Sequence, residues 1–340
     1  MDLPDVLLER VLGFLEDPRD VRAALLVHSR WHALLAQATL RALPDCVEEV
    51  VGTNEQRHHE RLFKGPLLGR QSHLSASMRR ILFDWLFEVS DEFHCAYETT
   101  FLSMHFIDAY LASSAPVPLA SLQLLGVTSL WIASKYEEVL LRPLNHFVLL
   151  CDGLYSRQQI SEMELALLFH LQFDLAVLTR FHVLQLLFPA ALLASHRRLV
   201  HLSTYLCFLS QFDESLSQQP PSLIAAAAFF LAAAYFSAGP QPTVPLPTVA
   251  RRVASLFPFS GPSDVLHVAG QLLAQFLHPH EFLQTSFMRN VFSQPRKARV
   301  ASLDLHDRHL HILASTLHDL EHSSLLSPVI EHEELSDSDA

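Results

Sequence analysis

The chain has 340 residues, of which 50% are apolar and only 18% are charged, and its formal net charge is −12 at pH 7. This composition excludes a disordered or fibrous chain and leaves enough apolar side chains for a large core. The acidic balance argues against binding to nucleic acid or to an anionic membrane surface. Because the cysteines form no CxxC pair and the histidines form no HExxH motif, we predict neither a metal site nor a cofactor.

The predicted elements are helices, because apolar residues recur at steps of three and four along most of the chain. Residues 1–43 hold three short helical stretches, and Asp17-Pro18 ends the first and begins the second. A unit of this size forms a marginal core, so we expect it to pack against something else. Residues 44–75 form a polar connector or an additional N-terminal helix.

Two sets of five helices are predicted next, over residues 76–176 and 177–284. In the first set, the fifth helix begins at Ser156, which forms a capping box with Gln159. The third helix of each set is rich in small residues, as expected for a central helix, and the two align at a spacing of about 100 residues. Only the first of these central helices ends in a charged cluster, which contains Lys135.

The last predicted segment, residues 285–340, is a tail that is disordered in part. It contains a short basic stretch at 296–299, an amphipathic helix around 303–322 and an acidic end. We expect no signal peptide, because the N-terminus lacks a positively charged region. The longest apolar run, residues 223–236, is too short to span a bilayer, so we predict no membrane partner.

The first helical set closely resembles the cyclin box. The resemblance rests on three ordered segments, which are MRRILFDWLFEVSDEF, LQLLGVTSLWIASKYEE and YSRQQISEMELALLFHLQFDL. The second set is similar to the C-terminal cyclin fold, with PPSLIAAAAFFLAA as the best-matching segment, and the similarity as a whole covers residues 76–303. It implies an all-α chain with two tandem five-helix cyclin folds.

The first 43 residues are similar to an F-box, with a Leu-Pro start and a hydrophobic pattern that ends at a tryptophan. An F-box followed by cyclin folds resembles the architecture of cyclin F, although the connector is shorter here. The resemblance implies binding to the adaptor that joins F-box proteins to a cullin ubiquitin ligase. The adaptor-binding residues would be Leu3, Pro4, Leu7, Leu12, Leu15, Val27 and Trp31. The alternative is a helical cap that packs on the cyclin fold.

The cyclin resemblance also implies that Lys135 and Glu164 bind a cyclin-dependent kinase. Lys135, at the end of a buried helix, would donate to backbone carbonyl groups of the kinase, and Glu164 would accept from backbone N–H groups. The alternative is that Lys135 merely interacts favourably with the helix dipole and that Glu164 is solvated.

A second implied site is a docking patch for substrate peptides of the Arg-x-Leu type. The predicted docking patch contains Met78, Ile81, Leu82, Trp85, Glu88 and Gln123. The peptide leucine would enter the apolar groove, and its arginine would pair with Glu88. Apolar residues at helical spacing are usually core residues, so some of this set must face inward.

Arg79 and Asp108 match a pair that cyclins keep as an internal ion pair between their first two helices. We predict a structural role for this pair. If one partner were removed, the other charge would remain buried and uncompensated, at a cost of about 3–5 kcal/mol.

These observations predict a regulatory or adaptor subunit rather than an enzyme, since the sequence has no phosphate loop, nucleophile elbow or metal-binding frame. One hypothesis is an adaptor that couples cyclin folds to a cullin ligase through the F-box. Another is a kinase-activating cyclin whose N-terminal helices form only a cap. A cyclin-fold protein of the general transcription factor type is disfavoured by the acidic charge. Unpaired cysteines and the family resemblance predict a location in the nucleus, the cytoplasm or both.

Overall fold

The computed structural model describes residues 66–113, 116–187, 196–238, 262–279, 283 and 286–322, and within these ranges every regular element is a helix. The first helical unit contains α5 (Ala76–Glu92), α6 (Tyr97–Ser113), the 3-10 turn η1 (Leu119–Ser121), α7 (Leu122–Glu137), α8 (Leu144–Leu150) and α9 (Arg157–His170). The second unit contains α10 (Arg180–Leu187), α12 (Arg197–Phe212), α13 (Glu214–Ser217), α14 (Pro221–Ser237) and α16 (Pro262–Leu277). A C-terminal segment adds α18 (Phe287–Phe292), η2 (Pro295–Lys297), η3 (Val300–Ser302) and α19 (Asp307–His322). The fourth helix predicted for the second set, at residues 246–257, lies outside the described ranges.

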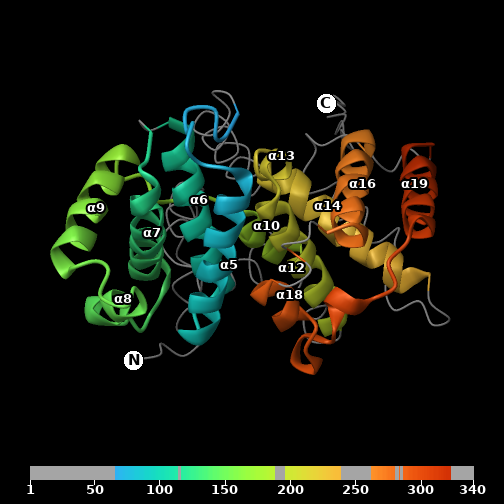
Figure 1. Cartoon of the computed structure of the whole chain (residues 1–340). Coiled ribbons are helices and arrows are strands. Elements are labelled where there is room, and N and C mark those ends of the chain that lie inside the picture. The colour runs from blue at the N-terminus through green and yellow to red at the C-terminus, as the bar shows by residue number, and fades with distance from the viewer. Residues whose placement is uncertain are drawn as a thin grey trace, which may run out of the picture.

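The central helix of the first unit is α7, which Figure 1 shows between α6 and α9. All of its residues from Leu124 to Ser134 are buried. Gly126 permits this close packing, because a Cβ atom there would lie only 2.6 Å from Leu82 Cδ1 on α5. The small residues that marked this helix in the sequence therefore set how near its neighbours can approach.

The central helix of the second unit is α14, which contacts α10, α12 and α16. Its residues from Pro221 to Ala234 are all buried, and they include most of the longest apolar run of the sequence. The run is a core helix because other helices pack around it. Among the described residues, no helix combines the length and the hydropathy that a bilayer crossing requires.

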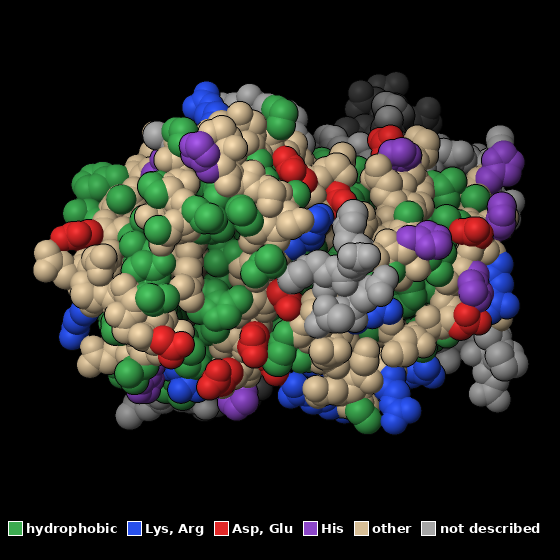
Figure 2. Space-filling view, in the orientation of Figure 1, with side chains coloured by type: hydrophobic (Ala, Val, Ile, Leu, Met, Phe, Trp, Pro, Cys, Tyr) green, Lys and Arg blue, Asp and Glu red, His purple; other side chains and the backbone are tan. Residues whose placement is uncertain are grey.

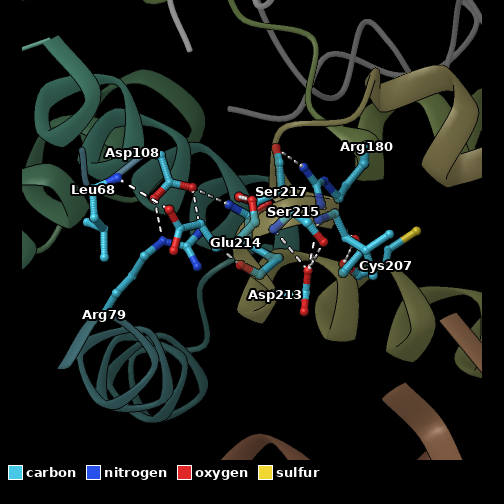
Figure 3. A network of polar contacts seen from close by, with 12 residues as sticks. Leu68, Arg79, Asp108, Arg180, Cys207, Asp213, Glu214, Ser215 and Ser217 are labelled. Atoms are coloured by element: carbon cyan, nitrogen blue, oxygen red, sulfur yellow. Dashed lines mark hydrogen bonds and ion pairs between the residues drawn. The ribbon is translucent and has the colours of Figure 1, made fainter. Parts of the chain in front are cut away.

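The joint between the two units contains the Arg79–Asp108 pair, which Figure 3 shows from close by. Arg79 Nε donates to Asp108 Oδ1 at 2.7 Å and Nη2 donates to Oδ2 at 2.6 Å, with both side chains only 1% exposed. Arg79 Nη2 also donates to the Gln211 carbonyl at 2.9 Å, and the Gln211 amide donates to Asp108 at 3.0 Å. Burial raises the pKa of Asp108, and the adjacent Arg79 charge opposes that rise.

The polar network continues into the second unit through Arg180, at the start of α10 (Figure 3). Its guanidinium donates to Ser210 Oγ at 2.6 Å and to the Ser217 carbonyl at 3.0 Å. Burial lowers the pKa of Arg180 to about 10, so the side chain stays cationic near neutral pH. The two units are thus joined by the bonds of Arg79 and Asp108 to Gln211, while the bonds of Arg180 connect elements within the second unit.

Residues 286–322, which belong to the segment predicted as a partly disordered tail, contain α18 and α19 and pack on both units. Asp84 on α5 accepts from the backbone N–H groups of Phe287 at 2.8 Å and Met288 at 3.0 Å. Farther along, α19 lies against α14 and α16 and buries Leu313 completely. The amphipathic helix predicted around residues 303–322 therefore packs on the second unit.

Candidate functional site

Lys135 and Glu164 lie next to each other at the surface of the first unit. Lys135 is in the last turn of α7, Glu164 is on the neighbouring helix α9, and their charged groups form an ion pair. Their side chains are 34% and 16% exposed, so neither is sealed in the core. Partial burial lowers the pKa of Lys135 from its ordinary value. The fold thus brings the two predicted kinase-binding residues to one accessible place.

Trp131 completes this cluster, and the sequence analysis did not single it out. Its indole Nε1 donates to Glu164 Oε2 at 2.9 Å, and Lys135 Nζ lies 5.0 Å from the centre of its ring. We call Trp131, Lys135 and Glu164 the charged rim. The available signal was the spacing of four between Trp131 and Lys135, which places both side chains on one face of α7. The indole fixes one carboxylate oxygen, so the cluster is ordered before any partner binds.

Exposed apolar side chains lie on α9 and directly after the C-terminal ends of α7 and α9. Leu140, directly after α7, is 88% exposed, and Phe169, near the end of α9, is 64% exposed. Figure 2 shows hydrophobic side chains spread over the half of the molecule that holds α5 to α9. The other exposed large apolar residues of these two regions are Val139, Leu141, Leu165 and Phe173. Such a concentration on one unit is typical of a protein-binding surface.

A cleft of about 780 Å³ opens beside the C-terminal end of α7. Glu138 lines the cleft and is bonded to the start of α6. One of its carboxylate oxygens accepts from Ala96 N at 2.8 Å and from Thr99 Oγ1 at 2.6 Å. Arg142 also lines the cleft. Its guanidinium donates to the Phe93 carbonyl at 3.0 Å and lies 4.7 Å from the centre of the Phe93 ring. The loop between α7 and α8 is therefore fixed at both ends, and its apolar side chains are held outward.

The predicted docking patch divides into surface and core. Ile81 is 55% exposed, Glu88 is exposed, and Met78, Trp85 and Gln123 are half-buried. Leu82 is a correction to the predicted set, because it is only 6% exposed and packs against the backbone of α7. It belongs to the core and can only form the floor of a groove.

The remaining predicted site residues fall into two groups. Arg79 and Asp108 form the buried ion pair described above, with no exposed surface for a partner. The predicted adaptor-binding residues, Leu3, Pro4, Leu7, Leu12, Leu15, Val27 and Trp31, lie outside the described residues. Within the described part of the chain, no three His, Cys, Asp or Glu side chains come together as a metal site.

Comparison with known proteins finds a family match over the first helical unit. Residues 49–176 match the family described as Cyclin, N-terminal domain. The match begins 27 residues before Ala76 (76 − 49), so it includes part of the predicted connector. The charged rim and the docking patch both lie within the matched residues.

Curated relatives support the cyclin family. The chain is 40% identical to Cyclin-A1-2 of Arabidopsis thaliana over 168 residues, which are 48% of this chain and 37% of that protein. It is 35% identical to G2/mitotic-specific cyclin-B of Dictyostelium discoideum over 194 residues, which are 56% of this chain and 44% of that protein. The chain thus spans less than half the length of these two relatives.

Among solved structures, a viral cyclin from Herpesvirus saimiri superposes with a TM-score of 0.53 at 19% sequence identity. The superposition covers 66% of this chain and 96% of the viral cyclin. An overlap of this extent is longer than the first helical unit, so it takes in part of the second. The all-α cyclin fold is therefore the fold of this chain.

Proposed function

We propose that this chain is a cyclin-type regulatory subunit that binds a cyclin-dependent kinase through the charged rim and performs no catalysis itself. The observation that carries the proposal is the accessible Lys135–Glu164 pair, held by Trp131 and bordered by exposed apolar side chains. The fold and the relatives support the class of partner. Cell-cycle control is the process in which such a subunit acts.

Binding would exchange part of the internal pair for contacts to the kinase backbone. Lys135 has three N–H donors and uses one on Glu164, so the others are available to carbonyl groups. Glu164 has acceptor capacity beyond its bonds to Trp131 and Lys135. Charge-assisted hydrogen bonds of this kind contribute about 1.5–3 kcal/mol each. Apolar residues such as Leu140 and Phe169 would add hydrophobic burial and would press the regulatory helix of the kinase into its active position.

The test measures affinity for a panel of purified cyclin-dependent kinases. The Lys135→Ala/Glu164→Ala variant should lose about a hundredfold or more in affinity, while its free energy of unfolding falls by only about 1 kcal/mol through loss of the Trp131–Glu164 hydrogen bond. The matched control is Arg157→Ala/Glu162→Ala, which removes an exposed cation and an exposed acid from α9 outside the charged rim. Equal binding by both double variants would refute the kinase-binding role.

We also propose that the docking patch recruits Arg-x-Leu substrate peptides. The exposed Ile81 and the half-buried Trp85 provide an apolar groove, and the exposed Glu88 provides an acid for the peptide arginine. A fluorescent Arg-x-Leu peptide should bind the wild-type chain, and Trp85→Ala should weaken it at least tenfold. A peptide in which alanine replaces the arginine and the leucine is the control. Equal binding of both peptides would contradict this docking mode.

Coupling to a cullin ubiquitin ligase is the further part of the proposal, and it rests on the F-box-like sequence of residues 1–43. Purified F-box adaptor should bind the full chain and should not bind Trp31→Ala. Kinase binding without adaptor binding would instead favour the N-terminal segment as a helical cap. Imaging of the tagged chain tests the proposed location in the nucleus, the cytoplasm or both.

A further inference from the structure

Two side chains on α10 face two buried acids of the first helical unit. His182 Nε2 lies 3.6 Å from Glu137 Oε1, and Gln185 Nε2 donates to Glu98 Oε1 at 2.5 Å. The His182 and Glu137 side chains are only 4% and 3% exposed. We call these four residues the joint cluster. Glu137 is the last residue of α7 and lines the cleft, so the joint cluster lies directly beneath the turn that carries the charged rim.

His182 also caps the N-terminus of α10, together with Thr179. The backbone N–H of Thr179 donates to His182 Nδ1 at 3.2 Å, and the backbone N–H of His182 donates to Thr179 Oγ1 at 3.3 Å. Together these bonds form a capping box in which histidine takes the place that Glu or Gln usually has. Because Nδ1 accepts a hydrogen bond, it carries no proton, and the proton of the neutral imidazole is on Nε2. Nε2 is the ring nitrogen that lies 3.6 Å from Glu137 Oε1, within the range of an electrostatic contact.

We infer that His182 is a positioning residue that fixes Glu137, and with it the last turn of α7, from the second helical unit. An imidazolium carries a proton on both nitrogens and could not accept from Thr179, so the geometry requires the neutral Nε2–H form. One ring thus links a helix cap of the second unit to an acid of the first. The second unit thereby sets the orientation of the surface that carries the charged rim, and this last step rests on the proposed kinase binding.

The test compares two substitutions at His182. A glutamine side chain can accept from Thr179 N–H through its oxygen and donate toward Glu137 through its NH₂ group, so His182→Gln should keep kinase affinity within about twofold. A leucine side chain can do neither, so His182→Leu should lose about tenfold in affinity. Gln211→Leu is the control, because it breaks a contact between the units far from the charged rim and should leave the affinity of folded protein unchanged. Equal affinities of the Leu and Gln variants at position 182 would overturn the inference.

A spectroscopic measurement keeps this inference separate from the proposed kinase binding. Carbon and nitrogen chemical shifts of His182 in the full chain should report the Nε2–H tautomer, and the Thr179 amide should exchange slowly with solvent. An Nδ1–H tautomer would overturn the inference whatever the kinase result. If the Lys135→Ala/Glu164→Ala variant binds kinase like wild type, the proposed function fails, and the tautomer still decides the role of His182.

Discussion

The two helical units share a buried central helix but differ at its C-terminal end. In the first unit, α7 ends with Lys135 paired to Glu164 at the surface. In the second, α14 ends with Tyr235 and Phe236, which carry no charge. The ring of Tyr235 lies 5.0 Å from the ring of His309 on α19, so the chain covers this end with its own helix.

This difference shows that the C-terminal end of a buried central helix can form either a binding surface or a contact within the same chain. The end of α7 is left open, and the exposed apolar residues of the described chain concentrate around the helices that follow it. Near the end of α14, Tyr235 and Phe236 are half-buried, and α19 packs along both α14 and α16. We therefore expect substitutions around α7 to affect binding and those around α14 to affect only stability.

The largest expected effect comes from the buried pair that joins the two units. Arg79→Ala should lower the free energy of unfolding by about 3–5 kcal/mol, because Asp108 would keep a buried and uncompensated charge. Urea denaturation followed by fluorescence measures this loss. Arg296→Ala is the control: Arg296 pairs with Asp91 at 2.9 Å but is 53% exposed, so its loss should cost at most about 1 kcal/mol. Similar losses in the free energy of unfolding for both variants would mean that burial does not determine how much the Arg79–Asp108 pair contributes to stability.

A smaller effect is expected from overpacking in the first unit. In the Gly126→Ala variant, the new Cβ would lie 2.6 Å from Leu82 Cδ1, so the Leu82 side chain or the helices that carry the two residues must shift. We expect a loss of about 1–3 kcal/mol in the free energy of unfolding. The double variant Gly126→Ala/Leu82→Ala should lose less stability than the sum of the losses of the two single variants, since removal of the Leu82 side chain relieves the clash. Thermal denaturation of the double variant and both single variants decides whether the close approach is responsible.

The next prediction concerns the charged rim alone. Trp131→Phe keeps an aromatic ring but removes the indole N–H that donates to Glu164 at 2.9 Å. We expect a loss of about 1 kcal/mol in stability together with weaker kinase binding, because the carboxylate is no longer fixed. Trp85→Phe, in the docking patch, should leave kinase binding unchanged. If Trp85→Phe weakened kinase binding and Trp131→Phe did not, the interface would lie on α5 instead.

The smallest effect has the opposite sign and lies in the second unit. Gly270 on α16 has open space around it, since a Cβ atom at this position would have Leu310 Cδ1 as its nearest neighbour, at 4.0 Å. Gly270→Ala should raise the free energy of unfolding by about 0.4–1 kcal/mol, because alanine restricts the unfolded chain and favours the helix. A destabilisation measured by calorimetry would show that α16 and α19 pack more closely than this distance indicates.

Much of the fold could be predicted from local sequence. The spacing of apolar residues located α5, α7 and α14, and the Ser156–Gln159 capping box marked the start of α9 correctly. These features depend on residues at most four positions apart, so the sequence displays them directly. The packing of α18 and α19 on the two units could not be predicted in this way, because their partner helices lie far away along the chain.

The sequence by itself determined the helices α5, α7, α9 and α14, the place of the charge asymmetry between the two central helices, and the family that the first unit resembles. Only the tertiary structure decided that Trp131 holds Glu164, that Leu82 is core while Ile81 is surface, and that His182 faces Glu137. These contacts join residues on different helices, and their distances depend on how the helices cross. Periodicity specifies which face of a helix is apolar, but the partner of that face is set by packing in three dimensions.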